Sequence, residues 1–266
     1  MAKARIFLCL LLAAPAFARS CAAQSVQDTA NSIAANPGRP TVSNPATLVP
    51  AGHVQFENGL LGATGSAEFS SYYEIDQTAK FAVNRRFEFI ESSQPEAHFE
   101  FAGKSSDSPS EVEVGAQAVI MPGEGMRPTV AVSYSRRVYG GSAPDLDTGS
   151  ARDYAVLYVS GDYRALHVDA NAFFNDQVQN GAQRMQYGQS LSVAYPLDGQ
   201  FALAGEIWRF TQPFLHGNAI GNLWALTYKV KPNLILDGGF EKGLTGTSTH
   251  WRAFTGFTYL LPHRFW

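Results

Sequence analysis

The clearest pattern in this sequence is a strict alternation of apolar and polar residues. Between residues 111 and 120, one parity carries Val112, Val114, Ala116, Ala118 and Ile120, and the other carries Glu111, Glu113 and Gln117. Successive side chains of a β-strand point to opposite faces, so this stretch predicts a strand with one apolar and one polar face. The same split recurs at residues 165–174 and 233–241.

Twelve such stretches follow one another, and no helical period competes with them. They lie near residues 53–62, 77–84, 86–95, 110–120, 128–138, 152–160, 164–174, 186–196, 200–210, 219–229, 233–242 and 249–260. Runs of roughly ten alternating residues are typical of strands that cross a membrane obliquely.

The connections between these stretches alternate between short and long. Tight turns are expected near residues 84–85, 121–127, 160–162, 196–199 and 231–233. Longer polar and glycine-rich loops are expected near residues 63–76, 96–109, 139–151, 175–185, 211–218 and 243–248. This alternation and the even strand number predict an all-β fold, a transmembrane antiparallel β-barrel of about 12 strands over residues 52–266. A soluble β-sandwich would also alternate, but it does not predict this order of loops.

The N-terminal part of the chain predicts export. Lys3 and Arg5 precede the apolar run 6–14 and the small residues 16–18, so residues 1–23 resemble a signal peptide with cleavage between Ala18 and Ala23. Cleavage after Ala23 would remove both cysteines of the chain. Residues 24–51 contain four prolines and no sustained period, and we expect an extended periplasmic N-terminal segment.

The C-terminal strand leads to the same compartment. Residues 251–259 alternate, and the chain ends on Phe265 and Trp266. A final alternating strand with an aromatic terminus suggests the outer membrane of a Gram-negative bacterium. We therefore expect contact with outer-membrane lipid, lipopolysaccharide and the barrel-assembly machinery.

Composition and charge add little to this picture. The 266 residues are 45% hydrophobic and 16% charged, with a formal net charge of −3. In a barrel, apolar lipid-facing residues alternate with polar inward-facing residues, so the two groups offset each other in whole-chain averages. A near-neutral chain has no basic footprint for nucleic acid, so no nucleic-acid partner is expected.

The polar parity defines the candidate site, because it should line the lumen. These residues are Glu57, Glu88, Glu111, Glu113, Arg137, His167, Asp169, Asn171, Glu206, Asp237, Glu241 and Arg252. They can set the selectivity of a pore for small solutes. Alternatively, they pair with one another in a non-conducting barrel with a structural or surface-interaction role, whose lumen is filled by side chains, by the segment before Gly52 or by an inward loop.

Catalytic chemistry is not expected. His167 and Asp169 share a face and could form part of a hydrolase triad, but no serine beside them has a recognisable nucleophile context. The other histidines lack metal-ligand spacing, so neither a metal nor another cofactor is predicted.

Several segments resemble one known family. They are residues 38–59 (GRPTVSNPATLVPAGHVQFENG), 81–89 (FAVNRRFEF), 111–117, 167–171 and 234–240 (LILDGGF). They look like the outer-membrane barrels grouped under the meta-pathway of phenol degradation. The resemblance implies a channel-like or transporter-like barrel, associated in some members with catabolism of aromatic compounds. The chain departs from that family at its end, where residues 261–264 separate the last strand from Phe265.

Overall fold

The structure is a computed structural model that describes residues 33–144, 146–147 and 151–265. The chain divides into two compact units, Met1–Ser32 and Ile33–Trp266, and only the second is described. The expected signal peptide, with its cleavage site and both cysteines, lies outside the described residues. Among the described residues, no helix is long and apolar enough to cross a membrane.

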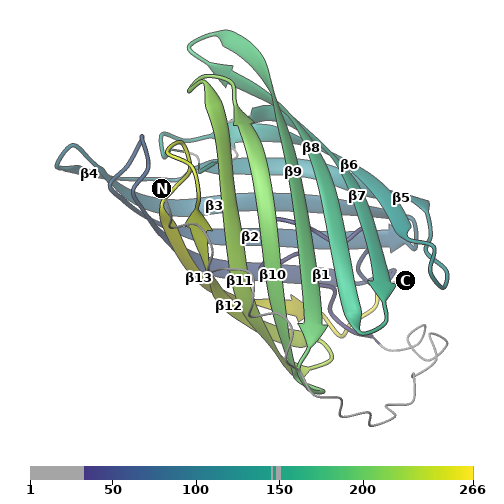
Figure 1. Ribbon diagram of the computed structural model, residues 1–266. Helices are drawn as coiled ribbons and strands as arrows, with labels where there is room; N and C mark the ends of the chain where they lie inside the picture. Colours follow the sequence, from purple (N-terminus) through teal and green to yellow (C-terminus); the bar gives the residue numbers. More distant parts are fainter. Residues whose placement is uncertain (1–32, 145, 148–150, 266) are drawn as a thin grey trace, which may run out of the picture. The chain divides into compact units, whose positions relative to one another are not determined.

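The described chain contains thirteen β-strands, coloured along the sequence in Figure 1. They are β1 (Val54–Thr64), β2 (Ser71–Asn84), β3 (Phe87–Phe101), β4 (Lys104–Ser108), β5 (Glu111–Met121), β6 (Thr129–Gly140), β7 (Ala151–Tyr163), β8 (Leu166–Gln179), β9 (Ala182–Pro196), β10 (Phe201–Gln212), β11 (Gly217–Lys231), β12 (Leu234–Gly243) and β13 (Trp251–Leu260). Strand β4 pairs only with β3 and lies in the connection to β5. The other twelve form the wall.

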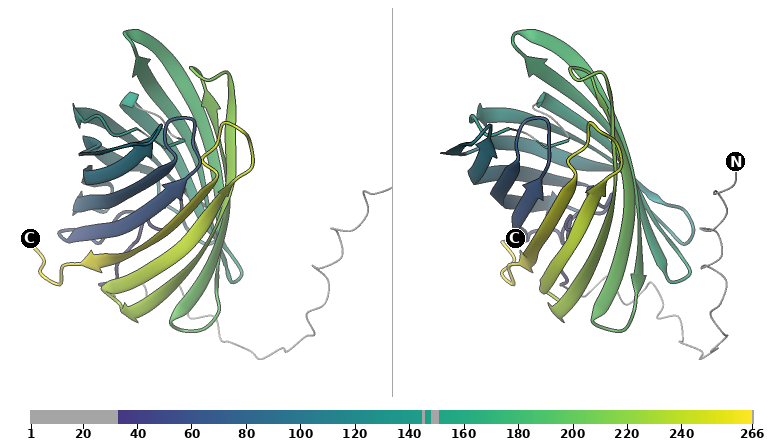
Figure 2. Two further views of the ribbon diagram at one scale, coloured as in Figure 1. Left: turned by 90° about the vertical axis from the view of Figure 1, so that its left-hand side faces the viewer. Right: turned by 60° about the vertical axis from the view of Figure 1, so that its left-hand side comes forward.

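The wall is closed. Each wall strand pairs antiparallel with the next one in the sequence, β3 pairs with β5 past β4, and β1 pairs with β13 from Gln55↔Leu260 to Thr64↔Trp251. Figure 2 shows the strands curving round to enclose an interior. Closure gives every wall strand two neighbours and leaves no edge with unpaired backbone groups. The predicted all-β antiparallel barrel of twelve strands is confirmed.

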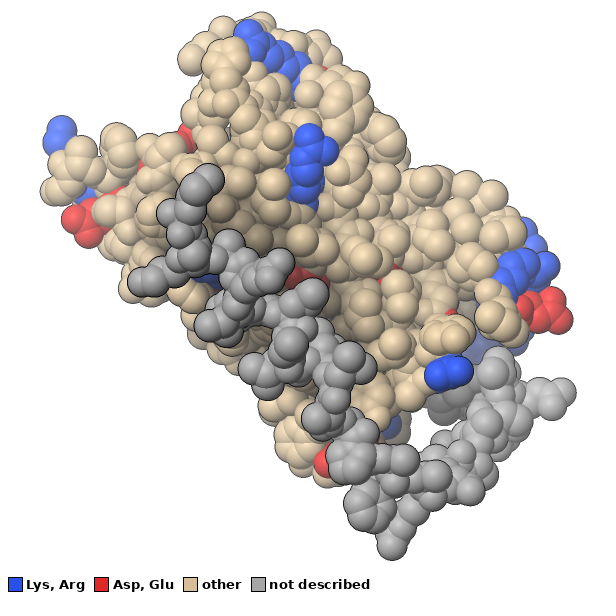
Figure 3. All heavy atoms as spheres, viewed as in Figure 1, with Lys and Arg blue, Asp and Glu red and all other residues tan. Residues whose placement is uncertain are grey.

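The outer face of the wall is apolar, and its inner face is polar and charged. Val114 and Leu236, from the apolar parity, are 44% and 41% exposed, whereas Glu57 and Glu241, from the polar parity, are 3% and 2% exposed. In Figure 3 the wall towards the viewer carries few charged side chains, which gather towards the ends of the strands. An apolar exterior around a polar interior is the arrangement that a lipid environment requires.

The connections differ from the expected pattern at one end of the barrel. Five short turns, at residues 85–86, 122–128, 164–165, 197–200 and 232–233, define the short-turn end, where β1 begins and β13 ends. The opposite, long-loop end was expected to carry a loop at residues 175–185. That prediction is wrong, because β8 and β9 continue to a two-residue turn at Asn180 and Gly181.

This turn follows from its sequence. Asn180 and Gly181 have φ values of 51° and 77°, and a two-residue hairpin turn with two positive φ angles favours Asn-Gly. The predicted loop at residues 96–109 is likewise partly a hairpin, since Ala102 and Gly103, with φ values of 51° and 75°, join β3 to β4. Two of the predicted long loops at this end are therefore wholly or partly β-hairpins.

One short turn shows how local hydrogen bonds stabilise its shape. Asp198 Oδ1 accepts hydrogen bonds from the backbone amides of Gln200 and Phe201, both at 2.7 Å. These bonds stabilise the carboxylate and lower the pKa of Asp198. Phe201 then begins β10 and stacks on Tyr228 of β11 at 4.7 Å between ring centroids.

Candidate functional site

The twelve polar residues predicted for the lumen all lie on the inner face of the wall. Seven are buried: Glu57, Glu88, Asp169, Asn171, Glu206, Asp237 and Glu241. The side chains of Arg252, Glu111 and Arg137 are 10%, 15% and 19% exposed, Glu113 lines an internal cavity, and His167 lies near the short-turn end at 40% exposure. The structure therefore brings these residues into one interior, although not into one cluster.

The N-terminal segment lies in the lumen, which the sequence analysis gave as an alternative to the expected periplasmic extension. Residues 33–51, here called the inner segment, were expected to extend into the periplasm. They lie instead within the ring of strands and contact the inner face of the wall, with Ser43, Ala46 and Val49 at most 2% exposed. The four prolines of residues 24–51 signal an absence of regular structure, but they do not reveal which partners the backbone finds.

Acidic side chains of the wall hold the inner segment through its backbone amides. Glu57 accepts hydrogen bonds from the amides of Gly38 and Arg39, each at 3.1 Å. Glu206 accepts from the amides of Val42 and Ser43 at 2.7 and 2.6 Å. Hydrogen bonds to an ionised acceptor are about twice as strong as neutral ones.

Other wall strands complete this attachment. Asn171 of β8 accepts from the amide of Asn44 at 2.7 Å, and Ser160 of β7 accepts from the amide of Ala46 at 2.6 Å. Glu88 of β3 accepts from the amide of Val49 at 3.0 Å. The contacts thus come from around the circumference, so the inner segment crosses the lumen.

Two acidic side chains of the wall hold an arginine of the inner segment. Arg39 lies 3.7 Å from Asp76 and 3.5 Å from Asp237, and both distances join a guanidinium nitrogen to a carboxylate oxygen. Gly59 and Gly256 leave the space that this guanidinium occupies, because a Cβ at either position would come within 3 Å of it. A glycine at an inward-facing strand position is a sequence signal for a close approach of another part of the chain.

The loop after β6 also enters the lumen at the long-loop end. Asp147 is 6% exposed, its carboxylate accepts hydrogen bonds from Arg252 and from the Thr249 amide, and its carbonyl accepts from Gln212 at 2.8 Å. Glu241 lies 3.4 Å from the same Arg252. The lumen is therefore narrowed from both ends.

A cavity of about 350 Å³ remains between the inner segment and the wall. It is bordered by residues 36–47 on one side and by inward-facing residues of strands β1, β2, β3, β5, β6, β7 and β8 on the other. Its lining is mixed, with carboxylates, amides, hydroxyls and three aromatic rings. This cavity is the part of the interior in which a small solute could reside.

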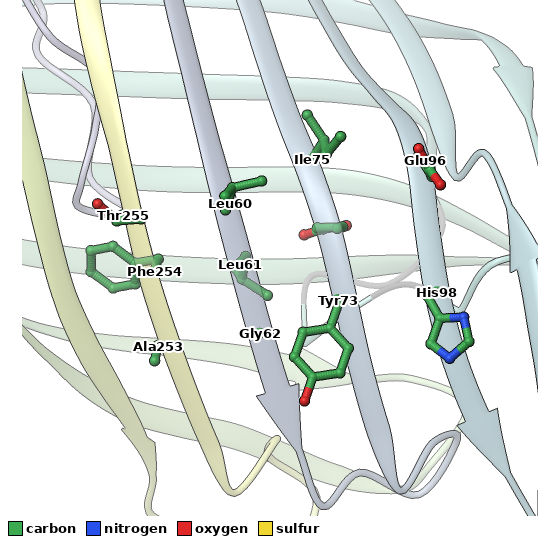
Figure 4. A pocket seen from close by; sticks show the side chains of 11 residues that line it. Leu60, Leu61, Gly62, Tyr73, Ile75, Glu96, His98, Ala253, Phe254 and Thr255 are labelled. Atoms are coloured by element: carbon green, nitrogen blue, oxygen red, sulfur yellow. The ribbon is translucent and has the colours of Figure 1, made fainter.

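A second hollow lies on the outward-facing side of the wall, over β1, β2, β3 and β13 (Figure 4). It measures about 610 Å³, and Leu60, Gly62, Tyr73 and Ala253 are among the residues that line it. It opens to the surroundings of the barrel, so it is separate from the internal cavity.

The His167 region does not have the geometry of a hydrolase site. The ring contacts Asp162 through Nδ1 at 2.7 Å and Asp169 through Nε2 at 3.2 Å. The nearby Ser160 hydroxyl donates to Asp169 at 2.5 Å rather than to the imidazole. A nucleophilic hydroxyl must hydrogen-bond to its general base, and these contacts do not join the Ser160 hydroxyl to the His167 ring. Among the described residues, no group of three or more His, Cys, Asp or Glu side chains could hold a metal ion.

No family model and no curated protein sequence matches this chain. Solved structures do match it. An outer membrane channel from Pseudomonas putida F1 has a TM-score of 0.61 at 11% identity, covering 84% of this chain and 100% of that one. The fold is that of an outer-membrane β-barrel.

Two porins support this assignment. NanC has a TM-score of 0.53 at 12% identity, covering 76% of this chain and 98% of its own, and KdgM has a TM-score of 0.52 at 15% identity, covering 77% and 98%. At these identities the likeness establishes the fold alone. The resemblance to the meta-pathway barrels stays an expectation.

Proposed function

We propose that this protein is an outer-membrane channel for small solutes, with a lumen narrowed by its own inner segment. The observation that carries the proposal is the closed barrel with a polar, charged interior that retains a cavity of about 350 Å³. Its structural neighbours are a channel and two porins, which supports the same class. The proposed location is the outer membrane, after signal-directed export, in contact with lipid and lipopolysaccharide.

The second candidate is a non-conducting barrel with a structural or surface-interaction role. The observation in its favour is the double obstruction of the lumen, by the inner segment and by Asp147. A channel requires that the inner segment leave a path or move, whereas a structural barrel requires neither.

Conductance of the purified protein in planar bilayers separates the two candidates. If the protein is a channel, we expect discrete conductance steps that appear only when the protein is added. Silent bilayers containing correctly folded barrels would favour the structural role. A liposome-swelling assay with aromatic acids and sugars then tests the aromatic solutes that the family resemblance implies.

A further inference from the structure

The apolar outer face of the wall is interrupted on β1, β2 and β3 by four polar side chains, here called the polar stripe. Asn58, Gln77 and Ser93 lie directly opposite one another in the register of these strands. Glu91 precedes Ser93 by two residues and lies opposite Val114 of β5, which faces outward at 44% exposure. Cross-strand partners share a face of the sheet, so the polar stripe lies on the side of the wall that meets lipid.

The polar stripe lies between the two edges of the apolar band. The outward-facing positions of β2 run from Phe81 through Gln77 to Tyr73, so Gln77 is equally far along the strand from the two rings. Barrels of the outer membrane carry aromatic girdles at both membrane interfaces, which places Gln77 near the middle of the hydrocarbon layer. In the middle of β5 and β7 the outward-facing side chains are apolar, for example Val114 and Leu157.

Lipid chains cannot satisfy the hydrogen-bonding groups of the polar stripe. Gln77 Nε2 donates to Asn58 Oδ1 at 3.1 Å, and within the described part of the chain these two side-chain amides make no other hydrogen bond. Each amide has two N–H donors and an acceptor oxygen, so most of this capacity is left for a partner outside the barrel. Hydrocarbon offers neither a donor nor an acceptor, and it also solvates the Glu91 carboxylate poorly.

The hollow of Figure 4 lies on the same outward face, beside the polar stripe towards the long-loop end. Leu60, the next outward-facing residue of β1 after Asn58, lines this hollow together with Tyr73 of β2. Both side chains are 59% exposed. This face therefore combines projecting apolar side chains with a hollow that can receive such side chains.

A second copy of this face has the shape and the chemistry to cover the first. Two copies related by a two-fold axis along the membrane normal meet at equal depth, so polar stripe meets polar stripe and hollow meets hollow. A side-chain amide donates and accepts at once, so Asn58 and Gln77 of the two copies can pair with each other. Leu60 and Tyr73 of each copy can enter the hollow of the other. A lipid chain supplies only the apolar part of these contacts.

We propose that the outward face of β1, β2 and β3 is the contact surface of a homodimer within the membrane. The polar stripes of the two copies hydrogen-bond to each other, and the two hollows receive Leu60 and Tyr73. The Glu91 carboxylate gains N–H donors from the second copy in place of hydrocarbon. This inference goes beyond the proposed function, since it holds whether or not the lumen conducts.

Energy transfer between labelled barrels in liposomes tests the inference. A dye is attached to Met126→Cys, at a position 84% exposed in a short turn, after both natural cysteines have been replaced by serine. Chains with the donor dye and chains with the acceptor dye are mixed and folded together into liposomes of increasing lipid content. We expect the transfer to persist on dilution, because it occurs within dimers. Transfer that falls in proportion to the dilution would show that lipid covers this face, and it would overturn the inference.

Two variants and a matched control locate the contact. Replacing Asn58 and Gln77 together by leucine removes both amides, and Ala253→Trp fills the hollow from an exposed, outward-facing position. Each change should reduce the transfer to that of unassociated barrels. Asn222→Leu removes an amide from β11, opposite the outward-facing Ile207, and should leave the transfer unchanged.

Migration on a mild-detergent gel before and after heating verifies that each of these variants forms a closed barrel. Among closed barrels, transfer that is the same in all three variants would contradict the assigned face. Loss of transfer in the Asn222→Leu variant alone would place the contact on β11 instead.

Discussion

At the scale of single residues, side-chain parity decides which solvent each position meets. Glu113 and Val114 are neighbours in sequence, yet one lines the internal cavity and the other is 44% exposed on the outer face. Register through the twelve strands is thus fixed by alternation, because a slip of one residue would exchange the two faces.

Replacing Val114 by arginine should destabilise the barrel by about 2–4 kcal/mol, since a charge on the lipid-facing side near the midplane is poorly solvated. Urea unfolding in lipid vesicles measures this change. Met126→Arg, at a position 84% exposed in a short turn, is the control and should have little effect. Similar losses for both variants would show that the outward face has been misassigned.

Glu206 gives a second test at this scale, because it holds the amides of Val42 and Ser43. Glu206→Ala leaves these buried donors unsatisfied and should cost about 1–3 kcal/mol of stability. It should also raise the rate at which an added protease cleaves near residue 42. Glu206→Gln retains an acceptor and should show a smaller change in both measurements, so an identical response of the two variants would count against this attachment.

At the scale of elements, the sequence predicts contacts between residues that are close together along the chain better than contacts between residues that are far apart along it. The alternation in residues 164–174 puts Asp169 and Asn171 on one face, and both are buried in β8, because strand periodicity is a local property. The turn at Asn180 and Gly181 was also a local signal, but the polar residues around it were interpreted as a loop. The inner segment could not be placed in this way, since Val42 finds its acceptor 164 positions away.

Gly181 provides a test of the β8–β9 hairpin. Its φ of 77° is unfavourable for a residue with a Cβ, and no atom would contact that Cβ within 4 Å. Gly181→Ala should therefore cost about 1–2 kcal/mol through backbone strain alone. Urea unfolding measures this cost.

Gly199→Ala is the matched control for that substitution. A Cβ there also meets no atom within 4 Å, but the backbone does not have a positive φ. Its stability should change little. Equal losses at the two glycines would contradict the assignment of the cost to the positive φ of Gly181.

At the scale of the whole molecule, the barrel is narrowed by two separate pieces of its own chain. The inner segment is attached to strands on several sides, whereas the deepest described contact of the loop after β6 is made by Asp147, which accepts hydrogen bonds from Arg252, Thr249 and Gln212. If the inner segment limits conduction, its removal should matter more than release of the loop.

Deletion of residues 33–50, with the export signal retained, should increase single-channel conductance in planar bilayers. Asp147→Asn weakens only the contact with Arg252 and should give a smaller increase. A shift in gel mobility on heating in mild detergent would verify that both variants still form closed barrels. An unchanged conductance after the deletion would mean that the inner segment does not limit the path.

The position of the inner segment also sets an order for assembly. Its residues precede every strand in the sequence, but their acceptors lie on strands as late as β10 and β12. Contacts between such distant positions form only after long stretches of chain have been brought together, which makes them slow to form. The first described part of the chain should therefore be among the last to find its place, once the strands around it have paired.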